Sequence, residues 1–217
     1  MVFGSTEEFT VSGGSLSSMD DRKQFFDSSA SVWDEKFTAN NRPERMARVA
    51  EWFGVREGEA VLDVGTGTGV LLPFLGKAVG EKGKVVAMDF ALNMLKAALC
   101  RDYAVIPEFV NAGVGAIPFR RESFDKVTCF SAFPHFPDKE RALSEMARVL
   151  RKGGVVLIAH LHSIEEIAEL HGNVGEAVRK DHLPGREAMV RLMEAAGLSG
   201  IDIINEPGKF LAQGQKN

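Results

Sequence analysis

Two acids and three closely spaced glycines carry the clearest chemical signal in this 217-residue sequence. Asp63 lies near the end of an apolar run and is followed by Gly65, Gly67 and Gly69. Glycine costs roughly 0.5–1 kcal/mol relative to alanine inside a regular element, so three together indicate that a ligand approaches the backbone. Asp89 lies 20 residues beyond Gly69, the separation at which a carboxylate accepts hydrogen bonds from both hydroxyls of a ribose. The pattern predicts a ligand that contains a nucleoside.

Three histidines follow apolar runs that we interpret as strands, and they are candidates for proton transfer. His135 comes just after the run 124–133, and His160 and His162 follow the run 155–159. Alternation along a strand would place His160 and His162 on one face, and parallel strands would bring all three imidazoles to one crevice. The alternative for each is that the imidazole caps a strand end and bonds a loop carbonyl.

A metal site is a further alternative for the same region. His160, His162 and His171, together with Glu165 or Glu166, are residue types that bind several divalent ions. A His-x-His pattern on a strand is common, however, and the sequence shows no second set of groups that would orient such ligands. We therefore expect no metal.

Apolar strands alternate with amphipathic helices along most of the chain. We expect strands at 61–64, 84–89, 105–110, 124–133, 155–159, 201–204 and 210–212. We expect helices at 20–37, 43–53, 70–80, 92–99, 143–150 and 186–196, and a further helix that begins at the capping box 163–166. The segment 20–37 is expected to form two short helices joined near 27–29, and Gly153-Gly154 is expected to cap the helix 143–150. Fully apolar strands indicate a mostly parallel sheet of seven strands with helices on both faces, a Rossmann-like α/β fold closed by an antiparallel C-terminal hairpin. Pro107 places the third strand at an edge, because proline cannot donate to a central ladder.

Composition favours one globular domain and a small partner. The chain is 45% hydrophobic and 26% charged, so we expect a single domain over 19–217, led by a lid segment at 19–40 and preceded by a flexible arm or expression remnant at 1–18. The net charge of −4 argues against nucleic-acid binding. No apolar stretch of about 18 residues and no signal-peptide pattern is present, so we expect no membrane span and a cytoplasmic location. Cys100 and Cys129 are expected to be buried free thiols.

The segment Val61-Leu62-Asp63-Val64-Gly65-Thr66-Gly67-Thr68-Gly69 has the form of the first motif of the class I S-adenosylmethionine-dependent methyltransferases. The sequence resembles that family over nearly all of 20–214, and its leading segment, with Phe25-Phe26-Asp27 and Trp33-Asp34, is similar to the quinone-biosynthesis-like, small-molecule branch (methyltransferase type 11). Further matching segments are Ile117-Pro118-Phe119, Ser123-Phe124-Asp125, Phe133–Asp138 and Arg148–Gly154. A dinucleotide fingerprint would require glycine where this chain has Val70, which disfavours the alternative of a nicotinamide-dependent oxidoreductase.

The resemblance implies S-adenosylmethionine as cofactor, with S-adenosylhomocysteine as product, and it implies roles for individual residues. The glycine turn and Asp63 would hold the methionine end, Asp89 the ribose, and Phe90 and Met94 the adenine; Ser131 would line the methionine side. The residues implied to contact the cofactor are Asp63, Gly65, Thr66, Gly67, Gly69, Asp89, Phe90, Met94, Gly113, Val114 and Ser131.

One position departs from the family pattern. Members usually carry an acid five residues before the proline that stands here as Pro118, and that acid accepts from the adenine amino group. This chain has Gly113 instead. The N–H of Val114 and the amide oxygen of Asn111 are the groups that could replace the acid.

The resemblance predicts methyl transfer to a small-molecule acceptor by in-line displacement. Such a reaction mainly requires alignment and exclusion of water, with a base only where the acceptor must lose a proton. The predicted catalytic residues are His135, His160 and Asp34, and the predicted lid or substrate residues are Phe25, Trp33 and His162, with 160–185 completing the roof. The alternative of another class is a non-catalytic nucleoside-binding or regulatory protein on the same fold. The sequence identifies neither the acceptor atom nor the oligomeric state, monomer or homodimer.

Overall fold

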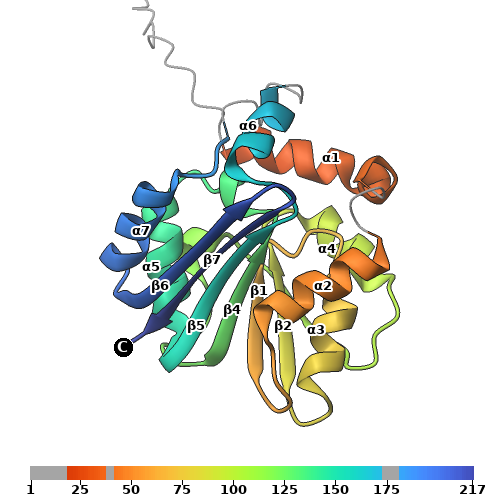
Figure 1. Cartoon of the computed structure of the whole chain (residues 1–217). Helices are drawn as coiled ribbons and strands as arrows, with labels where there is room; N and C mark the ends of the chain where they lie inside the picture. The colour runs from red at the N-terminus through yellow and green to blue at the C-terminus, as the bar shows by residue number, and fades with distance from the viewer. Residues whose placement is uncertain (1–18, 38–41, 173–180) are drawn as a thin grey trace, which may run out of the picture.

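A single mixed sheet organises the chain, and it positions the predicted site along one edge. The computed structural model describes residues 19–37, 42–172 and 181–217. The strands are β1 (Ala60–Val64), β2 (Lys84–Asp89), β3 (Glu108–Asn111), β4 (Phe124–Phe130), β5 (Leu150–His160), β6 (Leu198–Glu206) and β7 (Lys209–Lys216). Their order is β3-β2-β1-β4-β5-β7-β6, with β7 antiparallel to both β5 and β6 (Figure 1). The predicted seven-stranded sheet with a C-terminal hairpin is confirmed, and β3 lies at an edge as Pro107 predicted.

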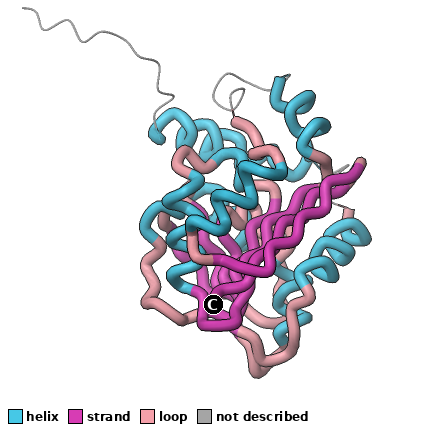
Figure 2. The backbone as a smooth tube through the Cα atoms, turned by 60° about the vertical axis from the view of Figure 1, so that its left-hand side comes forward, coloured by secondary structure: helices cyan, strands magenta, loops and turns pink. Residues whose placement is uncertain are grey.

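Helices cover both faces of this sheet (Figure 2). They are α1 (Met19–Phe37), α2 (Pro43–Phe53), α3 (Leu72–Val79), α4 (Leu92–Leu99), α5 (Lys139–Val149), α6 (Ile164–Gly172) and α7 (Arg186–Ala195), with short 3₁₀ turns η1 (Val114–Ala116) and η2 (Phe133–His135). Side chains of α2 and α3 share one buried cluster with the sheet, and those of α5 and α7 share another on the opposite face. Among the residues that the structure describes, no helix combines the length and apolar character that crossing a membrane requires.

Local sequence explains most element boundaries. All five residues of β1 are buried, as expected for a parallel strand covered on both faces. Helix α2 begins at Pro43 and ends at Gly54, which adopts a left-handed conformation. The predicted capping box opens α6: the Ser163 N–H donates to Glu166 at 2.7 Å, and the Glu166 N–H donates to the Ser163 hydroxyl at 3.2 Å.

The structure differs from the sequence-based prediction at several places. The strand expected at 124–133 ends at Phe130, and the strand expected at 105–110 begins at Glu108, after Pro107. The leading segment is one helix, because the Ser28 hydroxyl donates to the Phe25 carbonyl one turn earlier instead of capping a second helix. Helix α5 passes directly into β5 at Leu150, which pairs with Phe124, so Gly153-Gly154 lies inside the strand and is not the helix cap. Cys129 is a buried free thiol as predicted, whereas Cys100 is exposed because it follows the last turn of α4.

The central strand supports a first prediction about stability. Leu62 of β1 is fully buried, whereas Leu99 of α4 is 58% exposed. We expect Leu62→Ala to lower the free energy of unfolding by about 2–5 kcal/mol, because it leaves a cavity in the core. The matched change Leu99→Ala should stay within about 0.5 kcal/mol of the wild type. Urea unfolding measures both, and equal losses would contradict this assignment of the core.

Candidate functional site

The glycine turn after β1 presents its central residue to open space. Gly65, Gly67 and Gly69 have φ values of +71°, +55° and +76°, a region that favours glycine. A Cβ atom on Gly65 would lie 2.4 Å from that of Ala132, and one on Gly69 would lie 2.9 Å from that of Ala98. At Gly67 a Cβ atom would meet nothing within 4 Å. The outer glycines are therefore required by packing within the protein, and the backbone at Gly67 is the part that a ligand can approach.

Asp89 ends β2 beside this turn. One carboxylate oxygen accepts the Gly67 N–H at 2.8 Å, and the other accepts the Ala91 N–H at 2.9 Å. Each oxygen retains a lone pair for a further donor. Burial raises the pKa of Asp89 to about 6, with a further contribution from the charge of Asp63, while the two N–H bonds oppose the rise. A carboxylate with this geometry fits a pair of ribose hydroxyls.

Asp63 lies in β1, one residue before the strand ends, and is 2% exposed. Its Oδ1 accepts a hydrogen bond from the Thr128 hydroxyl of β4 at 2.7 Å. Burial raises the pKa of Asp63, and that hydrogen bond opposes the rise. Because β1 lies between β2 and β4, Asp63 sits at the centre of the sheet and at the same edge as Asp89.

The other residues implied to contact the cofactor occupy the loops along this edge. Met94 is buried in α4 beside the partly buried Phe90. The Asn111 side-chain amide donates to the carbonyls of Asp89 at 2.9 Å and Phe90 at 3.0 Å, which fixes the loop after β2. Ser131, directly after β4, is exposed and has φ +55°, a conformation that is uncommon for residues other than glycine. Thr66 is buried in the glycine turn, and Gly113 and Val114 open η1 after β3.

Helix α1 lies across this edge of the sheet and packs against α4 (Figure 1). Phe26 is at the centre of the contact. Its ring centroid lies 5.2 Å from that of Phe25, 5.5 Å from Trp33 and 5.8 Å from Phe90. The predicted lid residues Phe25 and Trp33 therefore belong to one aromatic cluster with Phe90, and Phe26, which is not among the predicted site residues, joins them.

Polar contacts tie α1 down along its length. Asp34 accepts from the Thr68 hydroxyl at 2.6 Å and pairs with Arg101. Asp27 accepts the N–H of Asn93 at 2.8 Å, in the first turn of α4. The structure thus places Asp34 against the glycine turn, where it joins α1 to that turn.

His135 is paired with an acid that the sequence did not reveal. Its Nδ1 lies 2.8 Å from Asp181, whose other oxygen lies 2.5 Å from Arg22 of α1. Burial alone would raise the pKa of Asp181, but the hydrogen bonds from His135 and Arg22 hold it below its usual range. The Phe26 ring lies 5.2 Å from the imidazole, so His135 borders the aromatic cluster of α1. No local motif marks Asp181.

The other histidines lie in different surroundings. The His160 ring lies 6.2 Å from the ring of Phe210 of β7, whereas His162 follows the end of β5 and its Nδ1 lies 4.0 Å from Glu166. Burial lowers the pKa of His162. The charge of Glu166 raises this pKa, and the charge of Arg45 lowers it further. These contacts place the three histidines against different partners, and that their imidazoles share one crevice stays a prediction. Strand β5 ends at His160, so its alternation does not extend to His162.

The alternative metal site gains no support from the described side chains. In the part of the chain that the structure describes, no group of three or more histidine, cysteine, aspartate or glutamate side chains could hold a metal ion. The side chain of His171 lies outside the described residues.

Comparison with known proteins gives concordant matches. A family profile described as a methyltransferase domain matches residues 62–158, and one described as protein-L-isoaspartate(D-aspartate) O-methyltransferase matches residues 18–104. The chain is 32% identical over 179 residues, 70% of its length and 71% of the relative's, to the ubiquinone/menaquinone biosynthesis C-methyltransferase UbiE of Enterobacter sp. (strain 638). It is 33% identical over 186 residues, 73% and 74% of the two lengths, to the protein of that name from Cronobacter sakazakii.

Solved structures agree on the fold. A SAM-dependent methyltransferase from Thermotoga maritima superposes with a TM-score of 0.72 at 18% identity, covering 89% of this chain and 99% of that one. A SAM-dependent methyltransferase from Aquifex aeolicus superposes with a TM-score of 0.63 at 25% identity, covering 84% and 98%. The topology found here, with β7 between β5 and β6, accords with these structures.

The polar contacts of α1 give a second prediction. We expect Asp34→Ala to release the Thr68 and Arg101 contacts, which are part-exposed and together contribute about 1 kcal/mol. Amide hydrogen exchange in 19–37 should then speed up roughly fivefold, while exchange in β1 and β4 stays unchanged. Asp102→Ala, which removes an exposed acid next to Arg101, is the control. Unchanged exchange in α1 would show that Asp34 does not hold the helix.

Proposed function

Because the chain belongs to the class I S-adenosylmethionine-dependent methyltransferases, we propose that it methylates a small-molecule acceptor in the crevice beneath α1. The curated relatives are named for ubiquinone and menaquinone biosynthesis, which supports an acceptor of low molecular weight. The observation that carries the proposal is the pairing of Asp89 with the open backbone at Gly67, 2.8 Å apart, because it presents a buried carboxylate beside the accessible part of the glycine turn.

The residues along the carboxyl edge fit the cofactor. Asp89 would accept the ribose hydroxyls, and the turn at Gly65–Gly69 with Asp63 would hold the methionine end. Phe90 and Met94 offer apolar surface to the adenine. Gly113 and Val114, at the start of η1, would border the adenine, and Thr66 and Ser131 would lie on the methionine side. Bound S-adenosylmethionine supplies a methyl group on a positively charged sulfonium.

Helix α1 would close the crevice over the reactants. Its aromatic cluster around Phe26 excludes water, and exclusion of water is the main protein contribution to an in-line displacement besides alignment. The Asp34 contacts favour a role in holding α1 on the glycine turn over direct catalysis. Trp33, whose ring lies 5.5 Å from that of Phe26, would offer an aromatic face to a cationic centre. His160 and His162, from their surroundings, would shape the β5 side of the crevice.

His135 is the best-supported general base for acceptors that must lose a proton. Its Nδ1 is engaged by Asp181 at 2.8 Å. With the Nδ1 proton directed at that carboxylate, Nε2 carries the lone pair that can accept a proton. Asp181 would thereby fix the tautomer and stabilise the imidazolium that forms, so it acts as a positioning residue.

Cofactor binding provides the third prediction. Ribose hydroxyls donate to the ionised form of Asp89, whose pKa is about 6. We therefore expect S-adenosylhomocysteine affinity to be constant above about pH 7 and to fall by up to roughly tenfold per pH unit below about pH 6. Asp89→Asn should bind at least about tenfold more weakly and lose this pH dependence. Calorimetric titration from pH 5 to 8 measures both.

The matched control is Asp102→Asn, an exposed acid outside the site, which should bind like the wild type. Binding of NAD(H) without binding of S-adenosylhomocysteine would overturn the cofactor assignment. Binding of S-adenosylhomocysteine with no methyl transfer to any acceptor would favour the non-catalytic alternative.

The base assignment provides the fourth prediction. We expect His135→Gln to lower turnover about 100-fold, measured as S-adenosylhomocysteine formed from a panel of phenols and amines, with cofactor affinity changed less than twofold. Asp181→Asn should lower turnover and move the rising limb of the pH–rate profile to lower pH, because the imidazolium loses a stabilising charge. Equal loss of turnover and cofactor binding in His135→Gln would instead indicate a structural role.

A further inference from the structure

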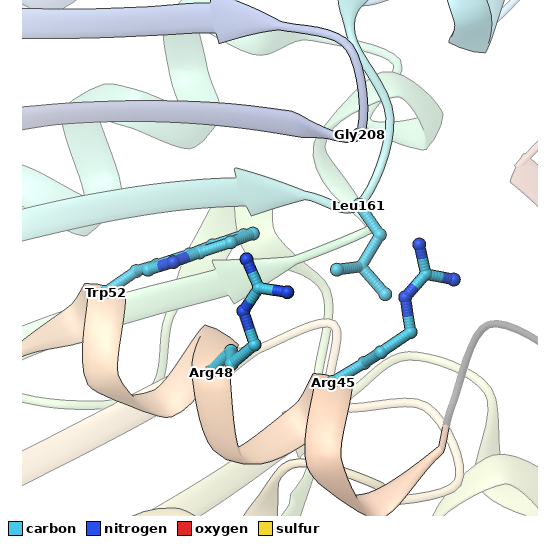
Figure 3. A pocket seen from close by; sticks show the side chains of 5 residues that line it. All are labelled: Arg45, Arg48, Trp52, Leu161 and Gly208. Atoms are coloured by element: carbon cyan, nitrogen blue, oxygen red, sulfur yellow. The ribbon is translucent and has the colours of Figure 1, made fainter.

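A group of cations surrounds a small hollow beside the crevice, on the side of β5. Arg45, Arg48, Trp52, Leu161 and Gly208 line it, with a volume of about 40 Å³. Figure 3 shows the side chains of both arginines and of Trp52 rising from α2 on the side of Leu161 and Gly208. The hollow is comparable to one or two water molecules, roughly 30 Å³ each in the liquid, so it admits a terminal group and not a whole ligand.

Three positive side chains converge here in a chain whose net charge is −4. Arg45 and Arg48 lie three residues apart on one face of α2, where like charges destabilise a helix by roughly 0.2–0.5 kcal/mol. Lys209, the first residue of β7, places its Nζ 4.8 Å from the centre of the Trp52 ring. The like charges of Arg45 and Arg48 do not stabilise each other on the helix, whereas a bound anion would stabilise both.

Glu166 is one acid near this end of the sheet, and its carboxylate already accepts the N–H groups of Ser163 at 2.7 Å and Gly208 at 2.9 Å. His162 lies 4.0 Å from Glu166, and its pKa is lowered by burial and by Arg45. Arg48 has no hydrogen-bond or ion-pair partner among the described residues, so its guanidinium is available to a ligand.

The position of the hollow connects it with the crevice. Leu161 directly follows the end of β5, and β5 is the neighbour of β4, after which Ser131 and His135 lie. The hollow is thus at the carboxyl edge of the sheet, where the acceptor is expected. Guanidinium groups bind carboxylates and phosphates through paired hydrogen bonds.

We propose that Arg45 and Arg48 form a subsite for an anionic group, a carboxylate or a phosphate, at one end of the methyl acceptor. That the ligand is the methyl acceptor rests on the proposed function. That the ligand is an anion rests on the positive side chains of α2 and on Lys209 of β7. Trp52 and Leu161 supply the apolar wall against which the attached portion of the acceptor would pack.

The first test probes the subsite alone. Inorganic phosphate and acetate, titrated separately into the full chain at constant ionic strength, should produce saturable shifts of the Trp52 indole N–H and His162 ring resonances. The double variant Arg45→Gln/Arg48→Gln should bind at least about tenfold more weakly. Arg120→Gln/Arg121→Gln removes the same charge from exposed positions before β4 and should bind like the wild type. The tighter of the two probes identifies the class of anion.

Equal shifts in the wild type and Arg45→Gln/Arg48→Gln, or shifts that do not saturate, would overturn the subsite and indicate an adventitious ion only. S-adenosylhomocysteine affinity is measured in the same three proteins and should agree within about twofold. Absence of that binding in the wild type would refute the proposed function, while the phosphate titration would still decide the subsite.

The second test asks whether the anion belongs to the acceptor. Matched acceptors, each a hydroxy acid and its methyl ester, offer the same nucleophile with and without the negative charge. The wild type should use the acid with a kcat/KM at least about tenfold higher, and Arg45→Gln/Arg48→Gln should lose that preference through a higher KM. Equal use of acid and ester by the wild type would overturn the assignment to the acceptor.

Discussion

The carboxylate of Asp89 is the group on which the arrangement of the site depends. Asp89 is the last residue of β2. Its carboxylate accepts the N–H of Gly67 from the neighbouring glycine turn and the N–H of Ala91 at the start of the next helix. A buried carboxylate is costly unless it is hydrogen-bonded, and here backbone donors from two loops meet that need. The same bonds hold the two loops in register, so the ligand contacts are organised before any ligand arrives. Neighbouring β1 and β4 add Asp63 and Thr128, joined across the sheet at 2.7 Å.

Helix α1 lies across the same edge of the sheet. It contributes Phe26, whose ring lies 5.8 Å from that of Phe90 and 5.2 Å from that of His135. Polar contacts at Arg22, Asp27 and Asp34 distribute its attachment over several turns. Each contact is modest by itself, so together they hold the helix by a few kcal/mol. If α1 is the cover proposed above, it can open at that cost.

Sequence alone was sufficient where local patterns fix local structure. The buried strands, the capping box at Ser163 and the edge position of β3 all follow from hydrophobic pattern and from the chemistry of single residues. The glycine turn and the strand-ending Asp89 were predicted for the same reason. The prediction failed at Ser28, whose hydroxyl bonds within the helix instead of ending it, and at the α5–β5 junction, where strand pairing with Phe124 outweighs the glycines as a stop signal. The role of Asp181 could not be predicted from the sequence, because Asp181 lies 159 residues from its partner Arg22 and no periodicity connects the two.

The Asp181 carboxylate connects helix α1 with the imidazole of His135. One carboxylate serves both the imidazole of His135 and the guanidinium of Arg22 on α1. If α1 opens as the proposed cover and Arg22 leaves with it, the negative charge of Asp181 is left to the imidazole alone and favours its protonated form. By reciprocity, a proton on His135 weakens the hold of Asp181 on Arg22 by an equal free energy. Opening of α1 and protonation of the imidazole would thus be two coupled equilibria.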